Sequence, residues 1–138
     1  MTAERLLLDT CAIFYVAESR FARQEASAKV EAAALHEELF VSPISALEIG
    51  RLSASGRLPI TADPSKFFSS FLAATGARLC SMEPNLLIES SYLPGKFHKD
   101  PVDRILVATA RFHGYALVTS DRAILNYGQE GYLKTLAC

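Results

Sequence analysis

Residues 100–121 read DPVDRILVATARFHGYALVTSD, and this stretch decides the fold. The Asp-Pro pair at its start is a helix cap followed by proline in the first helical turn, so we expect a helix up to His113. Gly114 ends that helix, because glycine tolerates the left-handed conformation found after helices. Residues 116–118 are a short apolar run, which predicts a buried strand. A helix followed directly by a buried strand is typical of an α/β fold.

The rest of the chain repeats this alternation. We expect strands at residues 5–8, 39–41, 78–82, 116–118 and 132–136. We expect helices at residues 11–17, 22–38, 43–55, 64–76, 84–93, 101–113 and 121–127, with a linker at residues 58–60. Alternating strands and helices predict an α/β fold with a mainly parallel central sheet covered by helices on both faces. No repeat or second domain is evident, so residues 1–138 form a single predicted domain.

Composition narrows the class of protein. Half of the 138 residues are apolar, enough to bury a core, and the formal net charge is −1. Strong nucleic-acid binders are usually basic, so this chain would need a local basic patch or metal ions to hold a phosphate backbone. No apolar run approaches the roughly 20 residues of a membrane span, and the first residues lack the build of a signal peptide. We therefore expect a soluble, cytoplasmic protein with no membrane contact.

Three cysteines, at positions 11, 80 and 138, agree with that compartment. They show no Cys-x-x-Cys spacing, and no histidine lies near them at the spacing of zinc ligands. Their number is odd. We therefore expect free thiols in a reducing cytosol.

Four carboxylates lie at the edges of apolar segments: Asp9, Glu48, Asp103 and Asp121. Burying a carboxylate is costly unless it is paired or bound to a cation. In parallel sheets the binding site lies at the carboxyl ends of the strands, where Asp9 and Asp121 are expected. We therefore predict that the four acids share one cation. Oxygen ligands without His or Cys favour Mg²⁺ or Mn²⁺ over zinc.

Each acid alone also has a structural explanation. Asp9 and Asp121 are good helix caps, and Asp103 in a first helical turn is favoured by the helix dipole. Glu48 is on the same helical stripe as apolar residues and should face inward, with a surface position as the alternative. Capping is the expected main role of Asp100. The prediction of a metal site depends on the four acids occurring together.

Four blocks of the chain resemble those of PIN-domain nucleases, and more narrowly the VapC-type toxins of bacterial toxin–antitoxin pairs. The blocks are residues 6–11 (LLLDTC), 42–50 (SPISALEIG), 99–110 (KDPVDRILVATA) and 117–121 (LVTSD), and residues 57–59 (RLP) also fit this subgroup. The resemblance spans nearly the whole chain in the family's order. It implies a PIN-like fold, a metal-dependent endoribonuclease, a cognate VapB-like antitoxin that inhibits it, and a homodimer.

The resemblance also implies the catalytic residues. The four acids of the family fall on Asp9, Glu48, Asp103 and Asp121, which would hold Mg²⁺ or Mn²⁺. The ion would polarise a phosphoryl oxygen of RNA and lower the pKa of a bound water for in-line attack, and whether a second ion binds stays open. Because crowded carboxylates repel one another, at least one should have a raised pKa without metal.

Other residues are expected around the quartet. Thr10 and Thr119 match hydroxyl positions of the family, and we count them with Arg104 as substrate-binding candidates. Arg104 adjoins Asp103 and would either hold a carboxylate or meet RNA. Asp100 matches a less uniform acid of the family, so it is a candidate metal ligand ranked below the four.

Two further expectations concern the surface. The histidines at positions 36, 98 and 113 are read as surface or structural residues, with a phosphate contact of His98 as a weaker alternative. The resemblance also implies an apolar groove for the antitoxin, for which several early residues are candidates, with plain core as the alternative: Phe14, Tyr15, Leu35 and Phe40.

Two other functions compete with the nuclease reading. A receiver-like phosphoacceptor domain also groups acids around magnesium, but it has an acid pair after the first strand, where Asp9 stands alone. It also has a lysine after its last strand, whereas Lys134 lies within the last predicted strand. A catalytically idle binding module of the same fold is the second alternative, and the complete quartet argues against it.

Overall fold

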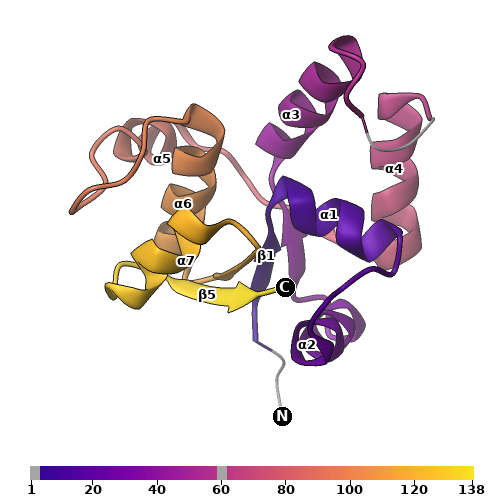
Figure 1. Ribbon diagram of the computed structural model, residues 1–138, viewed down its shortest axis with the longest axis horizontal. Helices are drawn as coiled ribbons and strands as arrows, with labels where there is room; N and C mark the ends of the chain where they lie inside the picture. The colour runs from indigo at the N-terminus through magenta and orange to yellow at the C-terminus, as the bar shows by residue number, and fades with distance from the viewer. Residues whose placement is uncertain (1–3, 59–61) are drawn as a thin grey trace.

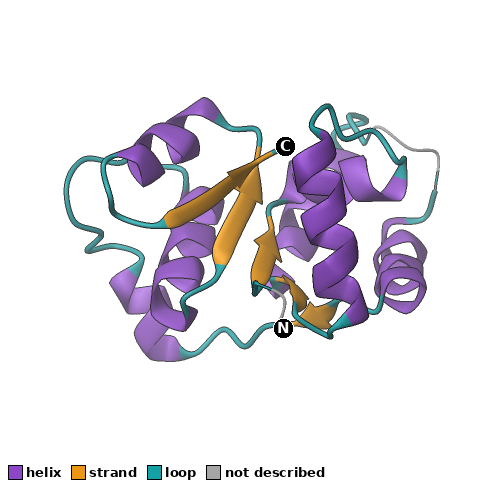
Figure 2. Ribbon diagram, turned by 90° about the horizontal axis from the view of Figure 1, so that it is seen from below, coloured by secondary structure: helices purple, strands orange, loops and turns teal. Residues whose placement is uncertain are grey.

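The computed structural model describes residues 4–58 and 62–138. At its centre is a five-stranded sheet in which every neighbouring pair of strands is parallel, in the order β3-β2-β1-β4-β5. The strands are β1 (Leu6–Leu8), β2 (Leu39–Val41), β3 (Arg78–Leu79), β4 (Ala116–Thr119) and β5 (Lys134–Ala137). Helices lie on both sides of this sheet (Figure 2). The predicted α/β class with a covered parallel sheet is confirmed.

The predicted helices are also present, in the predicted order. They are α1 (Thr10–Ala17), α2 (Gln24–Leu35), α3 (Pro43–Ala54), α4 (Pro64–Thr75), α5 (Pro84–Glu89), α6 (Pro101–His113) and α7 (Arg122–Gln129). Three of them begin with a capping side chain followed by proline, at Ser42, Asp63 and Asp100. Such caps satisfy backbone N–H groups that the first helical turn leaves unpaired.

Some boundaries differ from the prediction. α5 ends at Glu89, because the next residues turn through hydrogen bonds that span three residues. β5 begins at Lys134 and not two residues earlier, because the ring of Tyr132 stacks on Tyr127 with centroids 4.6 Å apart. Positions 59 and 60 of the predicted linker lie outside the described residues.

Each central strand is buried on both faces. In β1, Leu6 and Leu8 pack into a core with residues of α1, α2 and α4, whereas Leu7 packs into a second core with residues of α6 and α7. Figure 1 shows these two groups of helices on opposite sides of the sheet. All three leucines have no exposed surface. Because successive side chains of a strand point to opposite faces, a continuous apolar run is what a doubly covered strand requires.

Two expectations about the whole chain can be compared with the structure. All three cysteines carry free thiols. Within residues 4–58 and 62–138, no helix has both the length and the apolarity needed to cross a membrane.

The strand order creates a switch point between β1 and β4. From β1 the chain builds outward through β2 and β3 on one side, and later elements add β4 and β5 on the other. Ligands of open parallel sheets bind at the carboxyl edge beside such a reversal. The fold therefore locates the candidate site at the ends of β1 and β4.

Candidate active site

The ends of β1 and β4 bring two predicted acids to the switch point. Leu8 pairs with Val118 across these strands, and the N–H of Asp9 donates to the Val118 carbonyl at 3.1 Å. Asp121 follows the end of β4 by two residues. Since the two strands are parallel neighbours, both carboxylates lie at the same edge of the sheet.

Asp9 is the most buried of the four acids, with 5% of its surface exposed. Its Oδ1 accepts a hydrogen bond from the N–H of Ala12 at 2.8 Å, so the side chain caps α1. The pKa of Asp9 is raised to about 6, with burial as the largest cause; the charges of Glu48 and Asp121 contribute to the rise, and hydrogen bonds from Thr119 and Ala12 oppose it. The carboxylate is therefore costly to ionise where it lies unless a cation compensates it.

Asp103 lies in the first turn of α6, partly buried. Burial raises its pKa to about 7, and the charges of neighbouring acids, Asp100 first among them, add to the shift. The expectation that crowded acids have a raised pKa is confirmed in direction for Asp9 and Asp103. In both residues burial is the largest cause of the raised pKa, and repulsion by the other acids is a smaller one.

Asp100 itself is exposed and caps α6. Its Oδ1 accepts a hydrogen bond from the N–H of Asp103 at 3.0 Å. This geometry agrees with the capping role expected from the Asp-Pro pair. Its role as a metal ligand stays a prediction.

Asp121 and Glu48 approach the same place from other elements. Asp121 caps α7, with Oδ1 accepting from the N–H of Ala123 at 2.7 Å. Glu48 is half-buried on α3, and its charge raises the pKa of both Asp9 and Asp103. The four acids thus come from the ends of two strands and from two helices, and the fold brings them close enough to act on one another.

The two threonines hold the framework beneath the acids. Thr10 donates from its hydroxyl to Ser45 Oγ at 3.1 Å, which ties α1 to α3. Thr119 has no exposed surface, and its Oγ1 accepts from the N–H of Asp121 at 2.9 Å. Both hydroxyls are engaged inside the protein, and a contact of either with RNA stays a prediction.

Arg104 is bonded to the main chain. Its guanidinium donates to three backbone carbonyls, those of Ser90 at 2.8 Å and of Phe97 and His98 at 3.1 Å each. It therefore fixes the loop before α6. Of the two predicted roles, the structure shows no ion pair of Arg104 with a carboxylate among the described residues, and contact with RNA stays a prediction.

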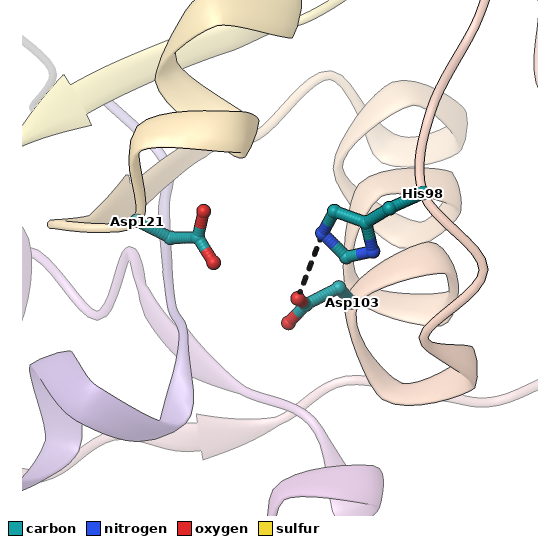
Figure 3. A group of neighbouring side chains, drawn as sticks. All are labelled: His98, Asp103 and Asp121. Carbon is teal, nitrogen blue, oxygen red and sulfur yellow. Dashed lines mark ion pairs between the residues drawn. The ribbon is translucent and has the colours of Figure 1, made fainter.

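His98, which the sequence predicts to be a surface or structural residue with a phosphate contact as the alternative, lies beside two of the acids. Its Nε2 lies 3.2 Å from Oδ2 of Asp103, and His98, Asp103 and Asp121 each offer a ligand atom within 4.8 Å of the others. Figure 3 shows the ring and the two carboxylates converging on one space. No helical or strand spacing links His98 to the acids, so periodicity gives no signal for it. Its position just before the Asp-Pro pair was the available clue.

The donor set suits a hard divalent cation. The ligand atoms that lie within 4.8 Å of one another belong to the carboxylates of Asp103 and Asp121 and to the imidazole of His98. Among the described residues, no Lys or Arg forms an ion pair with any of the four acids. Carboxylates with raised pKa values that pair with no Lys or Arg in the described part of the chain fit a divalent cation.

The residues predicted to line an antitoxin groove do not all lie together, because the sheet separates Phe40 from Phe14 and Tyr15. Phe14 stacks on Phe67 on the side of α4, with centroids 5.4 Å apart. Phe40 stacks on Tyr115 in the core on the opposite face, at 4.6 Å. Both are core residues, which was the stated alternative, whereas Leu35 on α2 is 84% exposed.

Comparisons with known proteins agree with this geometry. The model of the PIN domain family matches residues 6–129. Ribonuclease VapC22 from Mycobacterium tuberculosis is 31% identical over 123 residues, which cover 88% of this chain and 91% of that protein. The crystal structure of PAE2754 from Pyrobaculum aerophilum is similar with a TM-score of 0.61 at 22% identity, over 91% of this chain and 86% of the other. At that identity the structural likeness concerns the fold alone.

Proposed function

Since this chain belongs to the PIN-domain family and is of the VapC type, we propose that it is a metal-dependent endoribonuclease toxin. The observation that supports the proposal is that Asp9, Glu48, Asp103 and Asp121 lie near enough for their charges to raise the pKa values of Asp9 and Asp103. Membership of this family favours the nuclease over the receiver-like alternative, which belongs to a different class of domain.

We assign the cation to Asp9, Asp103 and Glu48, with Asp121 beside them. A bound Mg²⁺ or Mn²⁺ supplies Lewis-acid polarisation of a phosphoryl group and a lowered pKa for attacking water. The carboxylates of the chain supply the negative charge that would hold the ion, and helix caps orient two of these carboxylates. The caps on α1 and α7 fix one oxygen of Asp9 and of Asp121, which restrains both carboxylates.

The proposed substrate and partners rest on the relatives. The curated relative is named a ribonuclease of the VapC type, which supports RNA as the substrate. A cognate VapB-like antitoxin that blocks the site and a homodimeric assembly complete the proposal. An RNA substrate and an antitoxin partner imply action in the cytoplasm, by one PIN-like domain over residues 1–138.

Cleavage of a mixed RNA pool by the purified protein tests this proposal. The pool is incubated with Mg²⁺, with Mn²⁺ or with a chelator, and a DNA pool of matched length is the control. We expect RNA fragments with either metal and none with the chelator. Absence of cutting under every condition would contradict the proposal and favour an idle binding module. Labelling of one aspartate by acetyl phosphate would favour a receiver.

A further inference from the structure

His98 is held in a defined orientation. Its ring stacks on the neighbouring Phe97 with centroids 4.3 Å apart, and its Nδ1 accepts a hydrogen bond from the N–H of Asp100 at 3.3 Å. A backbone N–H can only donate, so Nδ1 must keep its lone pair. The neutral ring therefore carries its proton on Nε2. Nε2 lies 3.2 Å from Oδ2 of Asp103, within ion-pair distance.

The loop that presents His98 is anchored at several points. Arg104 donates to the carbonyls of Phe97 and His98, each at 3.1 Å. The hydroxyl of Tyr127 donates to the carbonyl of Pro94, and the rings of Phe97 and Tyr127 lie 5.0 Å apart. Arg104 is the neighbour of Asp103 on α6. The first turn of this helix therefore carries both the arginine that fixes the loop and the acid that His98 contacts.

We propose that His98 is a positioning residue that orients Asp103 for metal binding, an inference that rests on the proposed function. Other acids lie near Asp103, Asp100 first among them, and their charge repels that of Asp103. The contact of Nε2 with Oδ2 at 3.2 Å restrains rotation of the carboxylate and leaves its other oxygen available. Loss of such an outer-shell partner of a metal ligand typically costs about 10- to 100-fold in metal affinity or activity.

Mn²⁺ affinity of the full-length protein tests the proposal. The variants are His98→Ala, which removes the donor, and His98→Gln, whose amide can replace Nε2–H. The matched control is His36→Ala, because His36 is an exposed histidine that precedes β2 and so lies at the opposite edge of the sheet. We expect the Kd for Mn²⁺ to rise about 10-fold in His98→Ala. It should stay near the wild-type value in His98→Gln and in the control.

A second readout separates positioning from catalysis by the ring. Cleavage by His98→Ala should return to near the wild-type rate when Mn²⁺ is raised above its new Kd. Loss that saturating metal does not restore would overturn the proposal. A nitrogen coupling in the Mn²⁺ electron paramagnetic resonance spectrum would also overturn it, because the ring would then be a direct ligand. Metal-free thermal unfolding of each variant shows that the fold is kept.

Two different Mn²⁺ binding results distinguish a wrong role for His98 from a wrong proposed function. Equal Mn²⁺ affinity of wild type and His98→Ala overturns the role of His98 and leaves the metal site intact. Wild-type protein that binds neither Mn²⁺ nor Mg²⁺ overturns the metal-dependent function, and the positioning role with it.

Discussion

Asp9 performs two tasks at one position, and they can be separated chemically. One oxygen caps α1 through the N–H of Ala12, while the charge faces the other acids. Asparagine is as good a helix cap as aspartate, but it carries no charge. Asp9→Asn therefore keeps the cap and removes the charge, which makes it a clean probe of the site.

The raised pKa values predict how stability depends on pH without metal. The pKa of Asp9 is about 6 and that of Asp103 about 7, both above the value of 3.8 in a free side chain. Between pH 3.8 and about pH 7, the folded protein therefore binds more protons than the unfolded chain. The stability that Asp9 and Asp103 contribute is complete below about pH 4 and is lost as the pH rises towards 7. We expect the free energy of unfolding of wild type to fall over this range relative to Asp9→Asn.

Urea unfolding of both proteins at several pH values, with chelator present, measures this difference. Saturating Mg²⁺ should remove the decline in wild type, because the cation compensates the ionised acids. If the free energies of unfolding of wild type and Asp9→Asn changed with pH in the same way, the raised pKa assigned to Asp9 would be contradicted.

At the level of residues, local signals in the sequence single out four acids that the fold brings near one another, but not the position of His98 beside them. Asp9 and Asp121 follow buried strands, and Asp103 follows a helix cap, so each has a local signal. His98 depends on a loop that is held by Arg104 through backbone carbonyls. Such contacts join residues by their main chains and leave no pattern of side-chain types.

Among the elements, α6 allows a test of whether Asp100 is only a cap. Its Oδ1 accepts from the N–H of Asp103, and the side chain is exposed. We expect Asp100→Ala to lower the free energy of unfolding by about 1 kcal/mol and Asp100→Asn to change it by much less. If capping is its whole role, Asp100→Asn should bind Mn²⁺ as wild type does. A large loss of affinity in that variant would make Asp100 a ligand.

Arg104 connects α6 to the preceding loop, which gives a second prediction for this element. Because Arg104 bonds three carbonyls, Arg104→Ala should speed amide hydrogen exchange at residues 90–99. The exposed Arg122 on α7 provides the matched control, Arg122→Ala. Unchanged exchange in that loop combined with lost RNA cleavage would contradict the anchoring role and favour direct contact of Arg104 with RNA.

The predicted elements were right in kind and order because their ends carry strong local signals. Caps followed by proline mark the starts of α3, α4 and α6, and Gly76 and Gly114 take left-handed conformations after α4 and α6. Boundaries without such signals were less accurate. The last strand was placed too early, because Tyr132 looks like a strand residue and is in fact held in a turn by stacking on Tyr127.

At the scale of the whole molecule, we expect bound metal to stabilise the fold. A cation that binds only the folded protein adds about 2.7 kcal/mol at a concentration of 100 times its Kd. For a chain of this size, that corresponds to a rise in Tm of several degrees. Thermal unfolding with and without Mn²⁺ measures it. Asp103→Asn should lose the rise and Asp63→Asn should keep it, because Asp63 is an exposed cap on α4. An equal rise in both variants would contradict the site.

The sheet order was beyond what local patterns predict. Alternation of strands and helices is enough to predict parallel pairing, but not that β1 lies at the centre with β2 and β4 on either side. That order depends on which apolar faces meet in three dimensions. It matters for function, because the reversal between β1 and β4 brings Asp9 and Asp121 together.

The central claim is that these four acids form one metal-dependent nuclease site. The most direct test is the rate of RNA cleavage by wild type, Asp9→Asn and the distant control Asp63→Asn at one Mg²⁺ concentration. We predict a loss of about 100-fold or more in Asp9→Asn, since it removes a charge at the reacting centre, and no loss in Asp63→Asn. Equal metal-dependent rates in wild type and Asp9→Asn would contradict the account.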